Sequence, residues 1–256
     1  DVRIYNRALS EEEVAALYDL EKPDYSKNLD QGLVAYYPFN GNAKDLINGK
    51  EELITESKIE YSQDGEAISF SGEKAWLNAP KPKGITNSSP YSISVWIYPE
   101  QTTFGLFMLG DGSGSGSTGT IVCKRGVLTL DVGNAETGTG LKVSAGKWQH
   151  ICVSWDGLRY AVSITDDDGY LDWNNNTLHK SNLSYDKRPG WLPFGTENWK
   201  GLVIGSASHY SRAYNYKGHL KNFRIYNRAL SAEEIKALYD LEKPKSETSA
   251  TLGSLK

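Results

Sequence analysis

Three adjacent aspartates, Asp166, Asp167 and Asp168, form the densest acidic group in the sequence and stand directly before Gly169. Neighbouring carboxylates could serve as acid and base in hydrolysis, or they could hold a cation. An EF-hand loop needs acids at its first, third and fifth positions, and Ile164 occupies the first of these. We therefore interpret the cluster as a turn between two strands, with a cation-binding loop as the alternative and a catalytic pair as the least favoured hypothesis.

Other side chains with catalytic potential are not arranged for catalysis. No two of the four histidines stand four residues apart, the spacing with which a helix presents two metal ligands. His150 falls within an expected core strand, where we predict a structural role. Residues 112–119 alternate Gly and Ser but contain no G-x-S-x-G string, and they lack the strand-turn-helix context of a nucleophile elbow. We expect a flexible loop there and no catalysis by this chain.

The segment between Asp166 and Trp199 is rich in aromatic, amide and acidic side chains. Sugar rings have apolar faces and polar edges, so aromatic rings bordered by amides and carboxylates suit them. The candidate ligand-binding residues, including two tyrosines just beyond this segment, are Asp168, Tyr170, Trp173, Asn174, Trp191, Trp199, Tyr210 and Tyr214. The alternative is that these rings form a small satellite core beneath a long loop.

The composition argues against several classes of protein. The 256 residues carry 28 Lys and Arg against 32 Asp and Glu, a formal charge of −4, so the basic excess typical of nucleic-acid binding is missing. Mean hydropathy is −0.51, and no apolar run approaches the roughly 20 residues of a membrane-spanning helix. Twenty-five glycines, with 7 Trp, 16 Tyr and 6 Phe, indicate a β protein rich in turns.

Residues 1–23 recur as residues 222–244, with 18 of 23 positions identical. Such agreement marks one structural unit that occurs twice. In each copy an alternating run predicts a strand, at residues 2–5 in the first, and a helix follows. Ser10 and Glu13 match a capping box at the start of that helix, and a proline ends it.

Between the two copies, short alternating runs of apolar residues predict strands. Residues 92–99 alternate Ile, Val and Ile with Ser, Trp and Tyr, and residues 128–132 and 160–164 show the same period. Segments rich in Gly, Asn and Asp separate the runs, and no long helical pattern interrupts them. We predict an all-β fold, a two-sheet antiparallel jelly-roll sandwich with a short C-terminal helix.

The repeat also predicts the domain organisation. Residues 31–244 form the jelly-roll domain, residues 24–30 a linker, and residues 245–256 a tail. Residues 1–23 then correspond to the C-terminal strand and helix of a preceding unit.

Six motifs follow one another along the chain: GLVAYYPFNGNAKD at 32–45, AISFSG at 67–72, SISVWIYP at 92–99, GKWQHICVSWDG at 146–157, LVIGSA at 202–207 and FRIYNRALSAEEIKALY at 223–239. Together they resemble the laminin-G-like, concanavalin-A-like lectin/glucanase jelly roll of bacterial secreted multidomain proteins. The resemblance implies two antiparallel sheets, an extracellular or cell-surface location, and a concave face that binds sugars or proteins. The fold hosts lectins, adhesion modules, spacers and glycosidases alike, so it does not by itself specify the function.

The resemblance further implies a structural calcium on the convex side of the sandwich. The matching positions here are Asn40 and Gly41, with further oxygens from Asn42 and Asp45, and Asn222 where the family has an Asp. Replacing a carboxylate by an amide removes a full charge from a hard-cation site and weakens it. A plain turn without calcium is the alternative.

The two cysteines, Cys123 and Cys152, fall in two predicted strands. They are too few for a disulfide scaffold or a four-thiolate zinc site. A disulfide between them would suit an extracellular protein. The resembled family has a small apolar residue at the position of Cys152, which favours a buried thiol instead.

Glucanases of the resembled class carry E-x-D-x-E along one strand, which places three carboxylates on one sheet face beside the glycosidic bond. The sequence contains no such pattern. We therefore predict a noncatalytic carbohydrate-binding or adhesion module whose partner is a glycan or a surface protein. The alternative is a structural repeat, in which residues 1–23 add a strand to neighbouring copies and build a surface fibre or array. An active glycosidase is the least favoured hypothesis.

Overall fold

The computed structural model describes residues 2–21, 24–49, 53–54, 59–73, 75–85, 89–109, 119–132, 135–166, 171–179, 201–207 and 214–243. The elements in chain order are α1 (Glu11–Glu21), η1 (Tyr25–Asn28), β1 (Leu33–Tyr37), β2 (Leu53–Ile54), β3 (Glu60–Tyr61), β4 (Ile68–Ser71), β5 (Leu77–Pro80), β6 (Tyr91–Pro99), β7 (Phe104–Leu109), β8 (Gly119–Lys124), β9 (Val127–Val132), β10 (Ala135–Lys142), β11 (Gln149–Trp155), β12 (Arg159–Thr165), β13 (Leu171–His179), β14 (Gly201–Ile204), β15 (Lys217–Tyr226) and α2 (Ala232–Glu242).

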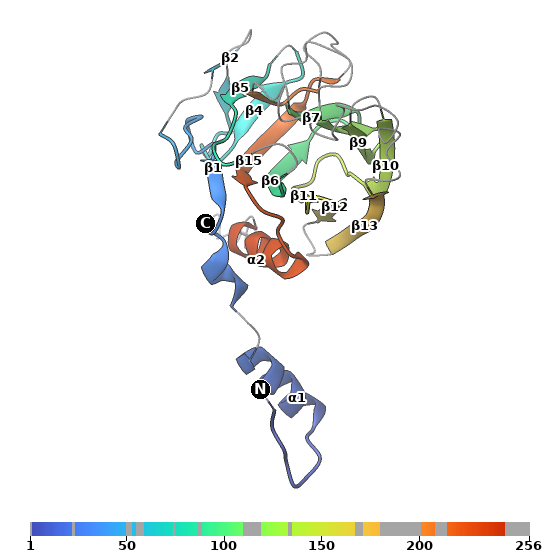
Figure 1. The fold of residues 1–256 in the computed structure, drawn as a ribbon. Helices are drawn as coiled ribbons and strands as arrows, with labels where there is room; N and C mark the ends of the chain where they lie inside the picture. Colours follow the sequence, from blue (N-terminus) through green and yellow to red (C-terminus); the bar gives the residue numbers. More distant parts are fainter. Residues whose placement is uncertain are drawn as a thin grey trace, which may run out of the picture.

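These strands form two sheets packed face to face (Figure 1). The eight-stranded sheet has the order β13-β12-β11-β6-β15-β4-β3, and β1 also pairs with β15. The seven-stranded sheet has the order β10-β9-β8-β7-β14-β5-β2. The predicted two-sheet antiparallel sandwich with a C-terminal helix is confirmed.

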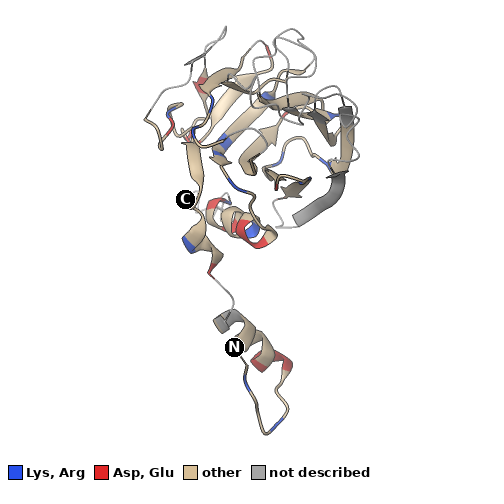
Figure 2. Ribbon diagram, viewed as in Figure 1, with Lys and Arg blue, Asp and Glu red and all other residues tan. Residues whose placement is uncertain are grey.

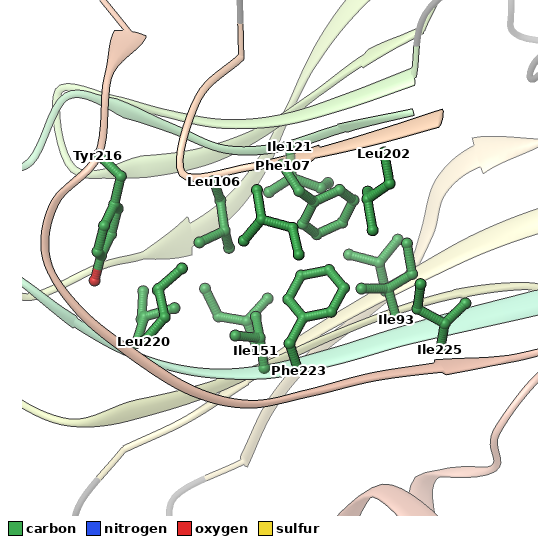
Figure 3. Packing of buried hydrophobic residues seen from close by; sticks show 14 of the residues in the cluster. Ile93, Leu106, Phe107, Ile121, Ile151, Leu202, Tyr216, Leu220, Phe223 and Ile225 are labelled. Atoms are coloured by element: carbon green, nitrogen blue, oxygen red, sulfur yellow. The ribbon is translucent and has the colours of Figure 1, made fainter. Parts of the chain in front are cut away.

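Alternating side chains build the core between the sheets. On β6, Ile93 and Val95 are buried in that core, whereas the intervening Ser94 is not part of it. Figure 3 shows Phe107 of β7 facing Phe223 of β15, with ring centroids 5.9 Å apart and planes at 90°. Period-two burial of apolar residues on both inner faces is what holds two sheets together as a sandwich.

Strand β15 changes partners in its middle. Its first half pairs with β4 and its second half with β1, while β6 pairs with both halves. At the junction Asn222 has a φ of 52°, and the register against β6 shifts between Lys221 and Arg224. This β-bulge lets both charged side chains point away from the core although they stand three residues apart.

Helix α2 covers part of the outer face of the eight-stranded sheet (Figure 1). Ser231 and Glu234 form the predicted capping box, with hydrogen bonds of 2.9 and 3.2 Å. Buried Ile235 packs in a small apolar cluster, and the Tyr239 ring stacks on Trp96 of β6 with centroids 5.2 Å apart. The helix is therefore anchored by side chains that the sequence places on one of its faces.

The two cysteines lie in different apolar clusters. Cys123 of β8 belongs to the core between the sheets, whereas Cys152 of β11 packs beneath α2 with Tyr226 and Leu230. Both thiols are buried and unbonded to each other. The disulfide alternative is wrong and the buried-thiol alternative is confirmed, because Cys123 lies in the core on one side of the eight-stranded sheet and Cys152 lies on the other side, beneath α2.

The N-terminal copy of the repeated unit lies away from the sandwich (Figure 1). Helix α1 forms as predicted, with a capping box of 2.9 and 3.3 Å between Ser10 and Glu13. The strand predicted for residues 2–5 is wrong: they lie outside the strands, and Val2 and Ile4 are each 94% exposed. A strand needs neighbouring strands to satisfy its backbone groups, and the pairings with β1 and β6 are made by β15 of the second copy.

Basic and acidic residues are interspersed along the described part of the ribbon (Figure 2). This mixture agrees with the nearly balanced composition, which lacks the basic excess of nucleic-acid-binding proteins. Neither described helix, α1 nor α2, combines the length and apolar character needed to cross a bilayer.

We expect Ile225→Ala to lower the free energy of unfolding by about 2–5 kcal/mol, because the side chain is fully buried between the sheets. The matched control is Ile4→Ala, at the equivalent position of the N-terminal copy, where the side chain is 94% exposed. Its effect should stay below about 0.5 kcal/mol. Chemical denaturation measures both, and equal losses would contradict the assignment of the second copy to the sheet.

Candidate sugar-binding groove

A groove crosses the outer face of the eight-stranded sheet beside the end of α2. It has a volume of about 1030 Å³, just above the usual range for small-molecule sites. Strands β1, β6 and β15 contribute to its lining, and the β3–β4 loop and the end of α2 border it. The residues that define its chemistry are Tyr36, Tyr98, Trp148, His219, Lys221 and Arg224.

Two aromatic rings and a cation form one part of the groove. The rings of Tyr98 and Trp148 are tilted by 59° with centroids 5.6 Å apart, and Lys221 Nζ lies 4.7 Å from the centre of the Trp148 ring. The His219 ring lies 5.8 Å from Tyr98, and its Nδ1 shares a 2.7 Å hydrogen bond with the Ser69 hydroxyl. The Tyr98 and Trp148 rings are therefore half-buried, and the Lys221 ammonium group lies beside them.

Arg224 is held from two sides in another part of the groove. Its guanidinium lies over the Tyr36 ring, 3.7 Å from the centroid, and its Nε donates to Glu242 Oε1 at 2.6 Å. The Arg224 and Glu242 side chains are 10% and 4% exposed, so the pair is largely shielded from water. Burial raises the pKa of Glu242, and the charge of Arg224 opposes the rise. The pair ties the end of α2 to β15.

Acidic side chains on the β3–β4 loop border the same groove. Burial lowers the pKa of Lys221, and the carboxylates of Glu66, Asp64 and Glu242 oppose that shift. Asp64 accepts hydrogen bonds from the Ser62 hydroxyl and, at 3.0 Å, from the Glu66 amide. The Ser62 bond is the main reason that the pKa of Asp64 is lowered. The groove therefore presents a cation near several acceptors.

His150 lies on the outer face of β11 beneath α2 and has the structural role expected of it. The side chain is fully buried, shares a 2.7 Å hydrogen bond with the Ser94 hydroxyl, and lies 5.4 Å from the Trp96 ring. Burial lowers the pKa of His150 to about 3, and the charge of Arg224 adds to the effect. The imidazole is therefore neutral at physiological pH.

Rings beside hydrogen-bonding groups can stack on the apolar face of a sugar while bonding its hydroxyls. The groove offers both kinds of group. Within the described ranges, no three His, Cys, Asp or Glu side chains gather in a way that could hold a metal ion. The described groove residues therefore offer aromatic faces and hydrogen-bonding groups side by side.

The ligand residues predicted from the aromatic segment are placed only in part. Trp173 and Asn174 lie in β13, which pairs with β12 at the edge of the eight-stranded sheet. Tyr214 is half-buried with Lys124 Nζ 5.2 Å from its ring centre, and it does not line the groove. The remaining candidates lie outside the described residues: Asp168, Tyr170, Trp191, Trp199 and Tyr210.

Two of the expected calcium ligands hold the turn that follows β1. The Asp45 carboxylate is buried; its Oδ1 accepts from the N–H groups of Tyr36 at 3.1 Å and Ile47 at 2.9 Å. Its Oδ2 accepts from the Asn48 side chain at 2.6 Å. Asn42 accepts a 3.0 Å hydrogen bond from the backbone two residues further on. Both side chains thus serve the turn that was the alternative to calcium.

Of the other three expected calcium ligands, two line the groove and one lies in the bend after β1. Asn40 and Asn222 line the groove, and Gly41 has a φ of 83°, which favours glycine. Asn222 lies inside β15 rather than at its start, and its Oδ1 accepts from the Tyr36 hydroxyl at 2.9 Å. Oxygens already bonded to N–H and O–H donors fit a hard cation poorly. Calcium binding by this set stays a prediction.

The central groove residues were not predicted as ligands, although strand alternation indicates some of them. Along β15 the buried Leu220 marks the inward face, so its neighbours His219 and Lys221 must point outward. The bulge at Asn222 breaks the alternation, and sequence periodicity therefore does not place Arg224 beside them.

No protein-family model matches the chain. An alignment over 117 residues is 30% identical to the pentraxin-related protein PTX3 of Mus musculus, and it covers 43% of this chain and 28% of that protein. Domain 4 of AbnA, a GH43 extracellular arabinanase from Geobacillus stearothermophilus solved with arabinotriose, matches with a TM-score of 0.59 at 21% identity, over 80% of this chain and 97% of that chain. The botulinum neurotoxin serotype D ligand binding domain, solved with N-acetylneuraminic acid, matches with a TM-score of 0.60 at 14% identity, over 86% and 53%.

These likenesses show the fold. The described sandwich has the concanavalin-A-like jelly-roll fold that the six sequence motifs indicated. The chain spans 28% of the curated relative and about half of the toxin chain, while it covers nearly all of the arabinanase domain. Arabinotriose and N-acetylneuraminic acid are ligands of those two neighbours, and a shared fold alone does not assign them to this chain.

Asp45→Ala should lower the free energy of unfolding by about 2–3 kcal/mol, because it leaves buried N–H groups without their acceptor. The loss should be the same in EDTA and in calcium. Asp45→Asn, which keeps one oxygen acceptor, should lose less. Thermal unfolding in both buffers is the measurement; a loss confined to calcium would show that the carboxylate binds the ion instead.

The neutral, buried His150 predicts a specific acid sensitivity. Its folded pKa of about 3 lies below the ordinary value of 6.5, so the unfolded chain takes up the proton first as the pH falls. Its stabilising effect is complete above about pH 6.5 and is lost toward pH 3, at about 1.4 kcal/mol per pH unit. The free energy of unfolding of His150→Gln should lack this component. The measurement is the free energy of unfolding of wild type and His150→Gln between pH 3 and pH 7. If both fall by the same amount over this range, the pKa of His150 is not lowered.

Proposed function

We propose that the chain is a noncatalytic carbohydrate-binding module of an extracellular protein, and that the groove over β15 is its sugar-binding site. The observation that supports this most is the arrangement of Trp148, Tyr98 and Lys221, with two tilted rings and an ammonium group 4.7 Å from one ring centre. A sugar ring has one apolar face to stack and a polar rim to bond, and this arrangement offers partners for both.

A pyranose or furanose stacked on Trp148 would meet polar groups at the edges of the groove. Lys221 offers N–H donors, and Asn40 and Asp64 offer oxygen acceptors within the same lining. Hydroxyl groups both donate and accept, so a border of mixed donors and acceptors suits them. The ring supplies contact area, and the polar groups supply orientation.

The structural neighbours support a glycan as the ligand. The arabinanase domain was solved with arabinotriose, and the toxin domain with N-acetylneuraminic acid. The arabinanase is extracellular, which supports the same location for this chain. If the glycan is displayed on a cell surface, the same binding gives an adhesion module.

A noncatalytic role is supported by the carboxylates of the groove. Three of them line it: Glu242 is bound to Arg224, and Asp64 and Glu66 are exposed on a loop. Hydrolysis of a glycosidic bond needs an acid and a nucleophile or base fixed on either side of it. The strand pattern E-x-D-x-E that supplies them in glucanases of this fold is missing from the sequence.

The test is binding of the purified chain to a glycan array, followed by calorimetric titration of the strongest glycan with wild type and Trp148→Ala. We expect Trp148→Ala to weaken binding by about tenfold or more, because it removes the stacking face. Trp148→Phe keeps a ring and should lose less. Lys221→Ala should also weaken binding.

The matched control is Lys124→Ala, because Lys124 also lies over an aromatic ring, that of Tyr214, but outside the groove. This variant should bind as wild type does. Trp191→Ala tests the aromatic segment predicted from the sequence. Binding that is lost in Trp191→Ala and kept in Trp148→Ala would move the site to that segment, and hydrolysis of the bound glycan would overturn the noncatalytic role.

A further inference from the structure

Two buried cations of β15 line the same groove. Of the lysines and arginines in the described ranges, only Lys221 and Arg224 are buried, each 8% exposed. The bulge at Asn222 turns both side chains to the outer face of the sheet, although they stand three residues apart. A buried charge is costly unless an opposite charge or hydrogen bonds compensate it. The partners of these two cations therefore decide what the groove can bind.

Arg224 is compensated at only one of its nitrogen atoms. Its Nε donates to Glu242 Oε1 at 2.6 Å, and the guanidinium lies over the Tyr36 ring. Among the described residues, no side chain or carbonyl accepts a hydrogen bond from the two terminal nitrogens of Arg224. These nitrogens carry most of the N–H donors of a guanidinium, and they remain free to bind a ligand in the groove.

Lys221 forms no ion pair within the part of the chain that the structure describes. Its ammonium group lies 4.7 Å from the centre of the Trp148 ring, a favourable contact that uses none of its donors for a conventional hydrogen bond. The carboxylates of Glu66 and Asp64 stabilise the charge from a greater distance. The effect of burial is larger, and the pKa of Lys221 is lowered.

The floor of the groove therefore carries an excess of positive charge. Lys221 and Arg224 face one largely buried carboxylate, that of Glu242, whose side chain is 4% exposed. The other two carboxylates of the lining, Asp64 and Glu66, are exposed on the β3–β4 loop. Water screens exposed charges much more strongly than buried ones, so the positive excess dominates close to the floor.

We propose that the groove selects sugars that carry an anionic group, a carboxylate or a sulfate ester, and that Lys221 and Arg224 bind this group. The inference rests on the proposed sugar-binding function and specifies the chemical class of its ligand. The anion accepts hydrogen bonds from Lys221 Nζ and from the terminal nitrogens of Arg224, while the sugar ring stacks on Trp148 beside Lys221. Hydrogen bonds between two charged groups are about twice as strong as neutral ones, so the anion contributes much of the selectivity.

The first measurement is binding to a glycan array on which each acidic glycan stands beside a counterpart without the charge, prepared by reducing the carboxylate or removing the sulfate. Calorimetric titration then compares the two members of the best pair. We expect the purified chain to bind the acidic member about tenfold more tightly or more, and the preference to fall as salt is added. Whether the carboxylated or the sulfated glycans bind distinguishes the two sources of the anion.

Lys221→Gln tests the cation that has no ion pair. It should weaken binding of the acidic glycan by about tenfold and binding of the neutral counterpart by less than about twofold, because Gln keeps N–H donors but loses the charge. Lys221→Arg should keep the preference. Glu66→Gln should strengthen binding of the acidic glycan by about twofold, since it removes an exposed charge of the same sign as the ligand. A purely structural role of either residue would not produce these opposite effects.

Lys124→Gln is the matched control, because Lys124 lies over the Tyr214 ring outside the groove. It should keep both affinity and preference. Arg224 is left in place, since its removal would leave the buried Glu242 carboxylate without its partner.

Equal binding of charged and neutral glycans, lost for both in Trp148→Ala, would overturn the inference and leave the sugar-binding function intact. An acidic preference that survives in Lys221→Gln would overturn the inference as well. Absence of binding to every glycan on the array would overturn the inference together with the proposed function.

Discussion

Strand β15 pairs with three strands, contributes side chains to the core and contacts helix α2. Its inner face supplies Phe223 and Ile225 to the packing between the sheets. Its outer face supplies Lys221 and Arg224 to the groove. The bulge at Asn222 makes both roles compatible, because it lets the strand change partners from β4 to β1 without burying either charge in the core.

The groove and α2 are coupled through the same strand. Arg224 lies over Tyr36 on one side and binds Glu242 at the end of α2 on the other. Nearby, Trp96 of β6 stacks on Tyr239 of α2. The position of the groove border therefore depends on α2 being docked against the sheet.

Much of this fold is accessible from sequence because local patterns and the final structure agree. The alternation in β6 and the capping boxes of α1 and α2 each predict the element that forms. The strand predicted at residues 2–5 did not form because a strand depends on pairing, which the local pattern does not encode. Tertiary context decides between two nearly identical segments.

The site was harder to predict than the fold for a related reason. Trp148, Tyr98 and Lys221 come from distant parts of the sequence, and only the pairing of β6 with β15 and β11 brings them together. The aromatic segment was conspicuous because its residues are close in sequence. Residue composition within one segment indicates chemistry, but a binding surface on a sheet is assembled across strands.

The central claim is that the outer face of β15 recognises a sugar. Chemical-shift mapping by NMR, with the chain titrated by the glycan that it binds best, tests this most directly. We predict that the perturbed signals cluster on the Trp148 indole, on Tyr98 and on residues 219–224. Perturbations confined to the seven-stranded sheet or to residues 167–200, with these signals unchanged, would contradict the claim.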